Sequence, residues 1–161
     1  MNIKEKLNKV GRALFIKLGQ GGRFEKECIE KNILKIDYSD ADHDLCSRDK
    51  WQKIKDYYVN KRGFINGVAT FHVNQIKYFY KGDENILWIT FYNNKLYWCF
   101  SENKLFLQKD NTKIRKVIGR WSCKNVKGKI LFLDNISGRL SKVQGFRGTI
   151  CSVSDNDYLI K

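Results

Sequence analysis

A β-hairpin is predicted by residues 85–100, which read NILWITFYNNKLYWCF. β-branched and aromatic residues fill both arms, and Asn93-Asn94 tolerate the positive φ that a two-residue hairpin turn requires. This turn pairs apolar residues across the arms: Leu87 with Phe100, Ile89 with Trp98, and Phe91 with Leu96. Because side chains alternate across a strand, these residues share one apolar face, which fixes the register and makes the hairpin the core of the domain.

The other face of the hairpin is mixed, carrying Ile86, Trp88, Thr90, Tyr92, Lys95, Tyr97 and Cys99. Two interpretations remain open for it. In one, a helix or a second sheet covers Trp88 and Tyr97. In the other, part of this face lines a cleft where an aromatic ring meets a ligand.

Length and composition indicate one folded domain covering residues 1–161. An apolar fraction of 42% and an aromatic fraction of 14% are typical of a globular chain and exclude a disordered basic tail. Proline is absent, so turns must use the 12 glycines together with Asn and Asp.

Five scattered cysteines, odd in number and without a CxxC pair, predict reduced thiols in a cytosolic protein. The N-terminus has no apolar signal region, and no run approaches the ~20 apolar residues of a membrane span. We therefore expect a soluble, cytoplasmic protein that does not contact a membrane.

Short strands and early helices follow one another along the rest of the chain. We expect helices at 2–10, 23–30, 48–61 and 68–80, and strands at 12–18, 33–38, 105–107, 113–118 and 149–153, with residues 158–160 docking the end. Because helices are inserted only in the N-terminal half and no βαβ rhythm is present, the predicted fold is α+β, a small β-barrel with two or three inserted helices.

A glycine-rich stretch, Gly19, Gln20, Gly21, Gly22 and Arg23, lies between the first strand and the helix after it. Backbone N–H groups at such a junction can bind an anion. No Lys-Ser/Thr follows, so the stretch does not match a P-loop. The alternative is a tight turn that lets helix and sheet pack.

The acidic loop from Asp40 to Asp44 includes His43 and precedes Cys46. Its residues suggest a zinc or hard-cation site, but Asp and Ser also form helix N-caps, and no second metal motif is present. Neither His43 nor His72 has the partners of a catalytic motif. We therefore predict no metal, no cofactor and no enzymatic activity, with a small metal-dependent nuclease using this loop as the least favoured alternative.

The net charge of +14 is concentrated in residues 113–147, where ten Lys and Arg face one Asp. A concentrated positive field attracts polyanions such as nucleic acid, although a lysine-rich proteome could also produce it. We predict that eight of these residues contact a nucleic-acid backbone: Lys113, Arg115, Lys116, Arg120, Lys124, Arg139, Lys142 and Arg147.

Aromatic and amide side chains are interleaved with these cations. Exposed rings stack on a base that has left its own stack, so we predict base contacts from Trp121, Trp88, Tyr97 and Gln144. The alternative for Trp121 is a core tryptophan that closes the barrel.

The segments Phe15-Ile16-Lys17-Leu18-Gly19-Gln20-Gly21-Gly22-Arg23, Glu27-Cys28-Ile29 and Ile33-Leu34-Lys35-Ile36 resemble the opening of PUA-like domains found at the front of some restriction-system proteins. Lys81-Gly82-Asp83 before a strong hairpin is also similar to the PUA-like barrel, including its EVE and YTH branches. The resemblance implies an aromatic cage for a modified base, from Trp88, Trp98 or Trp121, although the hairpin register places Trp98 on the core face.

Charge, rings and resemblance together predict a nucleic-acid-binding domain that reads a modified or flipped base in DNA as the sensor of a restriction or defence system. Such a sensor would work with a nuclease or NTPase partner subunit. An RNA-binding module on the same surface is the alternative, and the 2′-OH would discriminate between the two.

Overall fold

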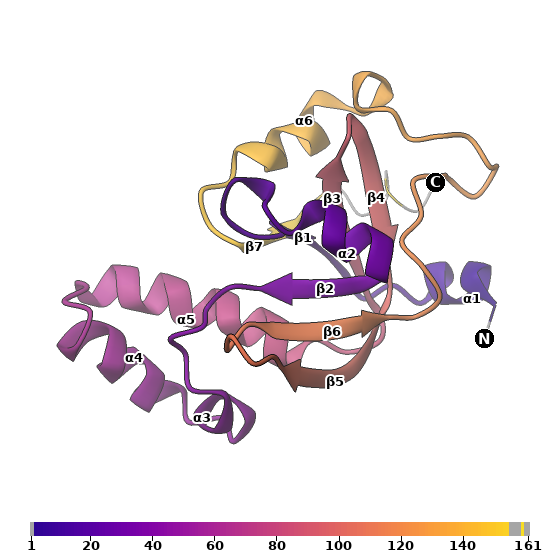
Figure 1. Cartoon of the computed structure of the whole chain (residues 1–161). Coiled ribbons are helices and arrows are strands. Elements are labelled where there is room, and N and C mark those ends of the chain that lie inside the picture. Colours follow the sequence, from indigo (N-terminus) through magenta and orange to yellow (C-terminus); the bar gives the residue numbers. More distant parts are fainter. Residues whose placement is uncertain (1, 155–158, 160–161) are drawn as a thin grey trace.

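The computed structural model describes residues 2–154 and Leu159 (Figure 1). In chain order the elements are α1 (Ile3–Asn8), β1 (Arg12–Ile16), η1 (Gln20–Gly22), α2 (Glu25–Lys31), β2 (Ile33–Ile36), α3 (His43–Ser47), α4 (Trp51–Asn60), α5 (Asn66–Lys81), β3 (Ile86–Tyr92), β4 (Lys95–Cys99), β5 (Ser101–Leu107), β6 (Lys113–Val117), η2 (Leu133–Asn135), α6 (Gly138–Ser141), η3 (Lys142–Gly145) and β7 (Ile150–Val153).

The hairpin forms in the predicted register. Ile89 pairs with Trp98 and Phe91 with Leu96 across β3 and β4. Asn93 and Asn94 have φ values of 50° and 62°, as a turn with two left-handed central residues requires. The sequence pattern of this stretch therefore determined both the turn and the face that each side chain occupies.

Two sheets hold the seven strands of the described residues. One has the order β4-β3-β1-β7 and the other the antiparallel order β2-β6-β5. The α+β class is thus confirmed, but neither sheet closes on itself, so the predicted barrel is not formed by these pairings. One pairing was not predicted: β1 runs parallel to β3, with α2 to α5 lying between them in the chain.

The largest core cluster lies between the two sheets. Trp88 of β3 is completely buried there against Leu34 and Ile36 of β2, with Phe79 of α5 and Cys28 of α2 at the sides. The second face of the hairpin is therefore covered by a sheet and helices, as the first of the two interpretations proposed.

The opposite face of the first sheet packs on a second cluster, to which α1 contributes Leu7 and α6 contributes Leu140. Leu159 also packs on this cluster, while the neighbouring residues 158 and 160, predicted to dock the chain end, lie outside the described residues.

A third cluster joins α3, α4 and α5 into a helical unit at one end of the molecule (Figure 1). The helices predicted at 48–61 and 68–80 are α4 and α5, so both are confirmed. The five cysteines are free thiols. No helix within the described residues has the length and apolar character needed to cross a membrane.

Candidate functional site

Lys113 and Arg115 do not contact solvent, so their predicted role at a nucleic-acid backbone is wrong. Both are fully buried. Lys113 Nζ donates to the carbonyls of Tyr38 and Ala41, the latter at 2.6 Å. The Arg115 guanidinium donates to the carbonyls of Phe79, Gly82 and Glu102. These two cations therefore satisfy backbone carbonyls at the end of α5, in the segment after β2 and in β5.

The two predicted base-contacting tryptophans are core residues. Trp88 is completely buried, and Trp121 is 5% exposed with its indole Nε1 donating to the carbonyl of Ile33 at 3.0 Å. Neither ring can stack on a base without unfolding the core around it. The core interpretation of Trp121 is thus the correct one.

The remaining predicted cations do not converge on one hollow. Lys116 is exposed on the second sheet beside Phe106, whereas Arg139 and Lys142 lie on α6 and η3 in the upper part of Figure 1. Arg120 and Lys124 are exposed in the segment after β6, and Tyr97 is half-buried against Tyr92. Of the eight cations, within the part of the chain that the structure describes, Arg147 alone lines the cleft described next.

That cleft, which we call the four-segment cleft, has a volume of about 520 Å³. Its walls come from four parts of the chain: Lys17 with the glycine stretch, residues 37–40 after β2, the end of α4 with the start of α5, and residues 147–149. The volume is within the ~300–1,000 Å³ typical of small-ligand sites.

Aromatic rings from the helical unit line one side of the cleft. Phe64 stacks on the His72 ring with centroids 5.3 Å apart, and Tyr58 stacks on Phe64 at 5.8 Å. Tyr38 reaches the same group from the end of β2, with its hydroxyl 2.8 Å from His72 Nδ1. Tyr58 is buried, whereas Tyr38, Phe64 and His72 are half-buried and present ring surface to the cleft.

The His72–Tyr38 pair is uncharged near neutral pH. Burial lowers the pKa of His72 below its ordinary value of 6.5, with smaller effects from Asp40, which raises it, and Arg62, which lowers it. Burial also raises the pKa of Tyr38 to about 12. A neutral imidazole and a neutral phenol, hydrogen-bonded to each other, thus offer uncharged ring faces on which a planar group could stack.

Positive charge lies around the rings. Arg62 pairs with Asp40 and lies over the Phe64 ring, 5.1 Å from its centroid. Lys17 Nζ donates to the Phe146 carbonyl at 2.6 Å, and the Arg147 side chain is exposed at the same wall. Asp40 neutralises Arg62, and Asp37, the other carboxylate of the lining, pairs with Arg23 outside it. The remaining positive charge of the cleft is therefore on Lys17 and Arg147.

A buried glutamine holds the wall that carries Arg147. Gln75 is 2% exposed, and its Oε1 accepts from the backbone N–H of Thr149 and, at 3.2 Å, from that of Ile150. Gly148 passes so close that a Cβ there would collide with the Gln75 amide. Gln75 therefore ties this wall to α5.

The glycine stretch forms a tight turn, as its alternative interpretation proposed. The N–H groups of Gly22, Arg23 and Phe24 bond to the carbonyls of Gly19, Gln20 and Leu18, so they are not free to bind an anion. A Cβ at Gly19 would lie 2.7 Å from the Phe24 ring, which explains the glycine there. The predicted anion-binding role is therefore not supported by these amides, although Gly19, Gln20 and Gly21 line the four-segment cleft.

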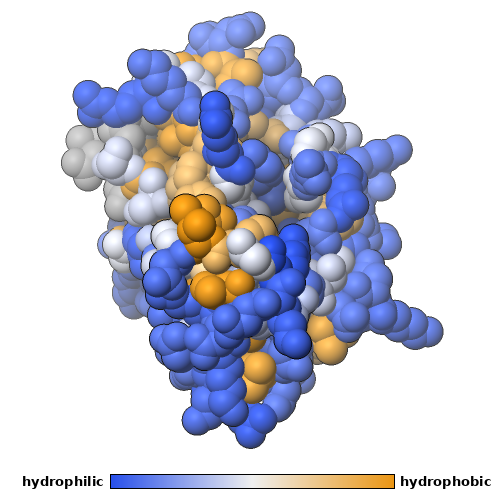
Figure 2. Space-filling view, turned by 90° about the vertical axis from the view of Figure 1, so that its left-hand side faces the viewer, coloured by the Kyte–Doolittle hydropathy of each residue, from blue (hydrophilic) through white to orange (hydrophobic). Residues whose placement is uncertain are grey.

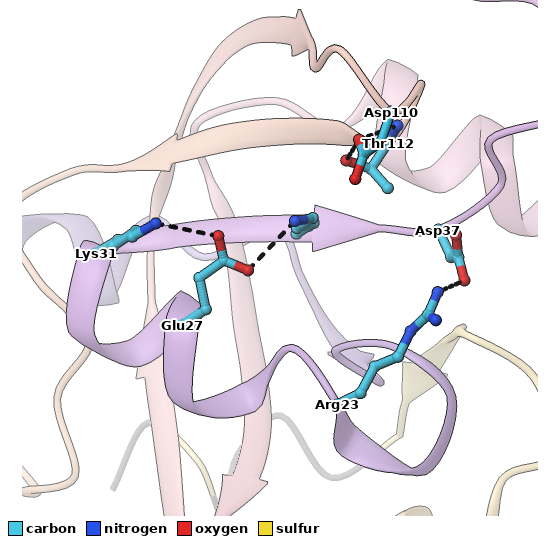
Figure 3. Close-up of polar contacts among 7 residues, drawn as sticks. Arg23, Glu27, Lys31, Asp37, Asp110 and Thr112 are labelled. Atoms are coloured by element: carbon cyan, nitrogen blue, oxygen red, sulfur yellow. Dashed lines mark hydrogen bonds and ion pairs between the residues drawn. The ribbon is translucent and has the colours of Figure 1, made fainter.

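Arg23 is also engaged in structure (Figure 3). Its guanidinium pairs with Asp37, which links the start of α2 to the end of β2. On the other side of the glycine stretch, a smaller hollow of about 220 Å³ is lined by Gln144 together with Lys17, Gly21 and Glu25. Gln144 is thus near the glycine stretch but not in the four-segment cleft.

The acidic loop is occupied by structural contacts. Asp42 caps α3 by accepting from the Leu45 N–H at 2.9 Å, Asp44 pairs with Arg48, and His43 Nδ1 lies 2.7 Å from the Tyr80 hydroxyl. Throughout residues 2–154, and at Leu159, no group of three or more His, Cys, Asp or Glu side chains could hold a metal ion. The N-cap interpretation of this loop is the one that the structure supports.

Sequence reasoning missed the aromatic lining because its members are far apart. Tyr38 lies in the segment after β2, Phe64 in the connection between two helices, and His72 in α5. The sequence pattern around each residue gives no sign of the other two. One signal was available: His72 lies next to the apolar face of α5 while being polar itself. Comparison of the chain with models of known protein families, with curated proteins and with solved structures finds no match.

Proposed function

We propose that this chain is a non-enzymatic nucleic-acid-binding domain that takes one unstacked base into the four-segment cleft. The observation that carries the proposal is the lining of the cleft, where half-buried rings lie beside two cations, Lys17 and Arg147, that have no acidic partner among the described residues. Rings bind the face of a base, and cations bind the phosphates next to it.

The base-contacting residues of this proposal differ from those predicted from the sequence. Phe64, His72 and Tyr38 replace Trp121 and Trp88, which are buried. Stacking on an aromatic ring contributes roughly 1–3 kcal/mol per base, enough to offset much of the few kcal/mol that unstacking a base from a duplex costs.

The preferred ligand is DNA carrying a modified or otherwise easily flipped base, with RNA as the alternative. The order of β1, glycine turn, α2 and β2 is the one that the PUA-like resemblance was based on. We propose on this ground that the two open sheets are a variant of the PUA-like architecture, and that the chain serves as the sensor of a restriction or defence system. Free thiols at all five cysteines are compatible with a reducing cytoplasm.

The test is a binding titration with salt as a variable. Fluorescence anisotropy would compare unmodified duplex DNA, the same duplex with modified cytosines or adenines, and RNA of the same sequence. Arg147→Ala should weaken binding to all of them. In a plot of log K against log salt concentration, it should also make the slope less steep by about 0.9, the value for one lost phosphate contact.

The matched control is Lys9→Ala, an exposed cation just after α1, which lies at the opposite side of Figure 1 from the connection between α4 and α5 that lines the cleft. It carries the same charge change and should leave the slope unaltered. If no nucleic acid binds at low salt, or if Arg147→Ala and Lys9→Ala behave alike, the cleft is not a nucleic-acid site.

A further inference from the structure

An apolar ridge stands exposed beside the four-segment cleft. It consists of Ile65, just before α5, and of Val68 and Phe71 in the first two turns of α5, with exposed fractions of 74%, 38% and 41%. Residues three apart on a helix are neighbours, so Val68 and Phe71 lie side by side on α5, and Ile65 precedes them at the start of the helix. Figure 2 looks onto this end of the molecule and shows apolar side chains gathered in the middle of a hydrophilic surface.

The fold gives no reason for an isoleucine at position 65. Ile65 is the N-cap of α5 and makes no side-chain cap hydrogen bond. Ser, Thr, Asp and Asn are preferred there because their oxygen accepts from the first free N–H groups of the helix, and isoleucine is among the poorest choices. Its side chain is also the most exposed of the large apolar residues that the structure describes, so it contributes neither to capping nor to the core.

The ridge adjoins the cleft through direct contacts. Phe71 packs edge-on against His72, with ring centroids 5.6 Å apart, and lies 6.0 Å from Phe146. His72 lines the cleft, as does Arg147, the residue after Phe146. At the other end, Ile65 follows Phe64 and Arg62, which also line it. The ridge thus adjoins the ring-lined cleft at two places, through Phe71 at His72 and through Ile65 at Phe64.

We propose that this ridge enters the base stack of a nucleic-acid duplex and occupies the space of the base that turns into the cleft. The inference rests on the proposed function and adds the duplex as its ligand. Apolar side chains inserted between two adjacent base pairs unstack them. The free-energy cost of unstacking is offset because the deformed duplex contacts a larger protein surface. Phosphates next to that base step would lie near Arg147 and Lys17, because Arg147 follows Phe146 and Lys17 Nζ donates to the Phe146 carbonyl, beside Phe71 of the ridge.

Ile65→Ser tests the wedge without weakening the fold, because serine is a favourable N-cap at that position. The probes are a fully paired duplex, the same duplex with one mismatch, and the single strand, all at one salt concentration. For Ile65→Ser we expect about a tenfold loss of affinity for the paired duplex, a smaller loss for the mismatched one, and less than about a twofold change for the single strand, since only paired bases need unstacking.

The matched control is Ile3→Ser, which removes an equally apolar, 51% exposed side chain from α1. It should change none of the three affinities. The wedge is overturned if Ile65→Ser loses the same affinity for the duplex as for the single strand, if it loses no affinity, or if Ile3→Ser loses as much. In each of these cases the wild-type protein still binds nucleic acid, so the proposed function stands.

Vesicles of anionic and zwitterionic phospholipid complete the experiment. Binding to anionic vesicles that Ile65→Ser abolishes, with duplex affinity unchanged, would overturn the wedge and assign the ridge to a lipid surface. If the wild-type chain binds none of the nucleic acids, both the wedge and the proposed function are overturned.

Discussion

Arg115→Met should destabilise the folded chain strongly, although arginine is a residue type that usually lies at the surface. The guanidinium is fully buried and donates four hydrogen bonds to three carbonyls, those of Phe79, Gly82 and Glu102. Burial lowers the pKa of Arg115 to about 10, so the group remains protonated at neutral pH. Methionine fills similar space but leaves the three carbonyls without donors.

The size of the effect follows from those carbonyls. Each buried acceptor left unsatisfied costs about 1–3 kcal/mol. Removing the charge also removes its desolvation penalty of several kcal/mol, which offsets part of that cost. We expect a net loss of about 3 kcal/mol in the free energy of unfolding, or a decrease in Tm of roughly 6–12 °C for a chain of this size.

Urea unfolding followed by tryptophan fluorescence measures this loss, since Trp88 is buried in the core next to Arg115. Lys116→Met is the matched control: it is the next residue on β6, it is exposed, and it should change the free energy of unfolding by less than about 0.5 kcal/mol. Arg115→Lys should be intermediate because an ammonium cannot reach all three carbonyls. The reasoning is refuted if Arg115→Met is as stable as Lys116→Met, or if its only defect is weaker nucleic-acid binding.

Three further changes have clear signs. Burial lowers the pKa of His72 from 6.5, so below that pH the unfolded chain binds more protons than the folded one. The free energy of unfolding should therefore decrease as the pH is lowered from about 7 to about 5, and it should decrease less in His72→Gln. Urea unfolding at each pH measures both decreases. Gly148→Ala should cost about 1–3 kcal/mol through collision with Gln75, whereas Gly145→Ala, where a Cβ meets open space, should cost under about 1 kcal/mol; a thermal melt of both variants compares them. Asn94→Gly should be neutral or stabilising and Asn94→Val destabilising by about 1–2 kcal/mol, because φ is 62° there; equal melting temperatures would contradict the turn geometry.

The sequence was informative wherever burial followed hydrophobic periodicity. The hairpin register came from the alternation of Leu87, Ile89 and Phe91, and α4 and α5 came from apolar residues at helical spacing. Such patterns determine which side of an element faces the core, because one residue of slip would expose the whole apolar set.

Strand β6 shows where this reasoning fails. Its alternate residues form two faces, one with Ile114 and Lys116 and one with Lys113, Arg115 and Val117. Two charged residues on one face against a single isoleucine on the other would favour burial of Ile114. The structure buries the two cations instead, because they reach carbonyls that no strand or helix satisfies. Unpaired carbonyls arise only when distant segments meet, so no window of the sequence reveals them.

The cations of residues 113–147 are scattered in the folded chain for a related physical reason. Charge density along a chain becomes charge density in space only if consecutive residues share a face, and a strand sends alternate residues to opposite sides. Of residues 113–147, Arg147 reaches the four-segment cleft, where it meets Lys17 from the end of β1 and Arg62 from the end of α4. The two cations of the cleft that have no acidic partner among the described residues, Lys17 and Arg147, therefore lie near opposite ends of the sequence. A test of nucleic-acid binding that changes only residues 113–142 would miss them, whereas Lys17 and Arg147 together should account for the cleft's share of the salt dependence.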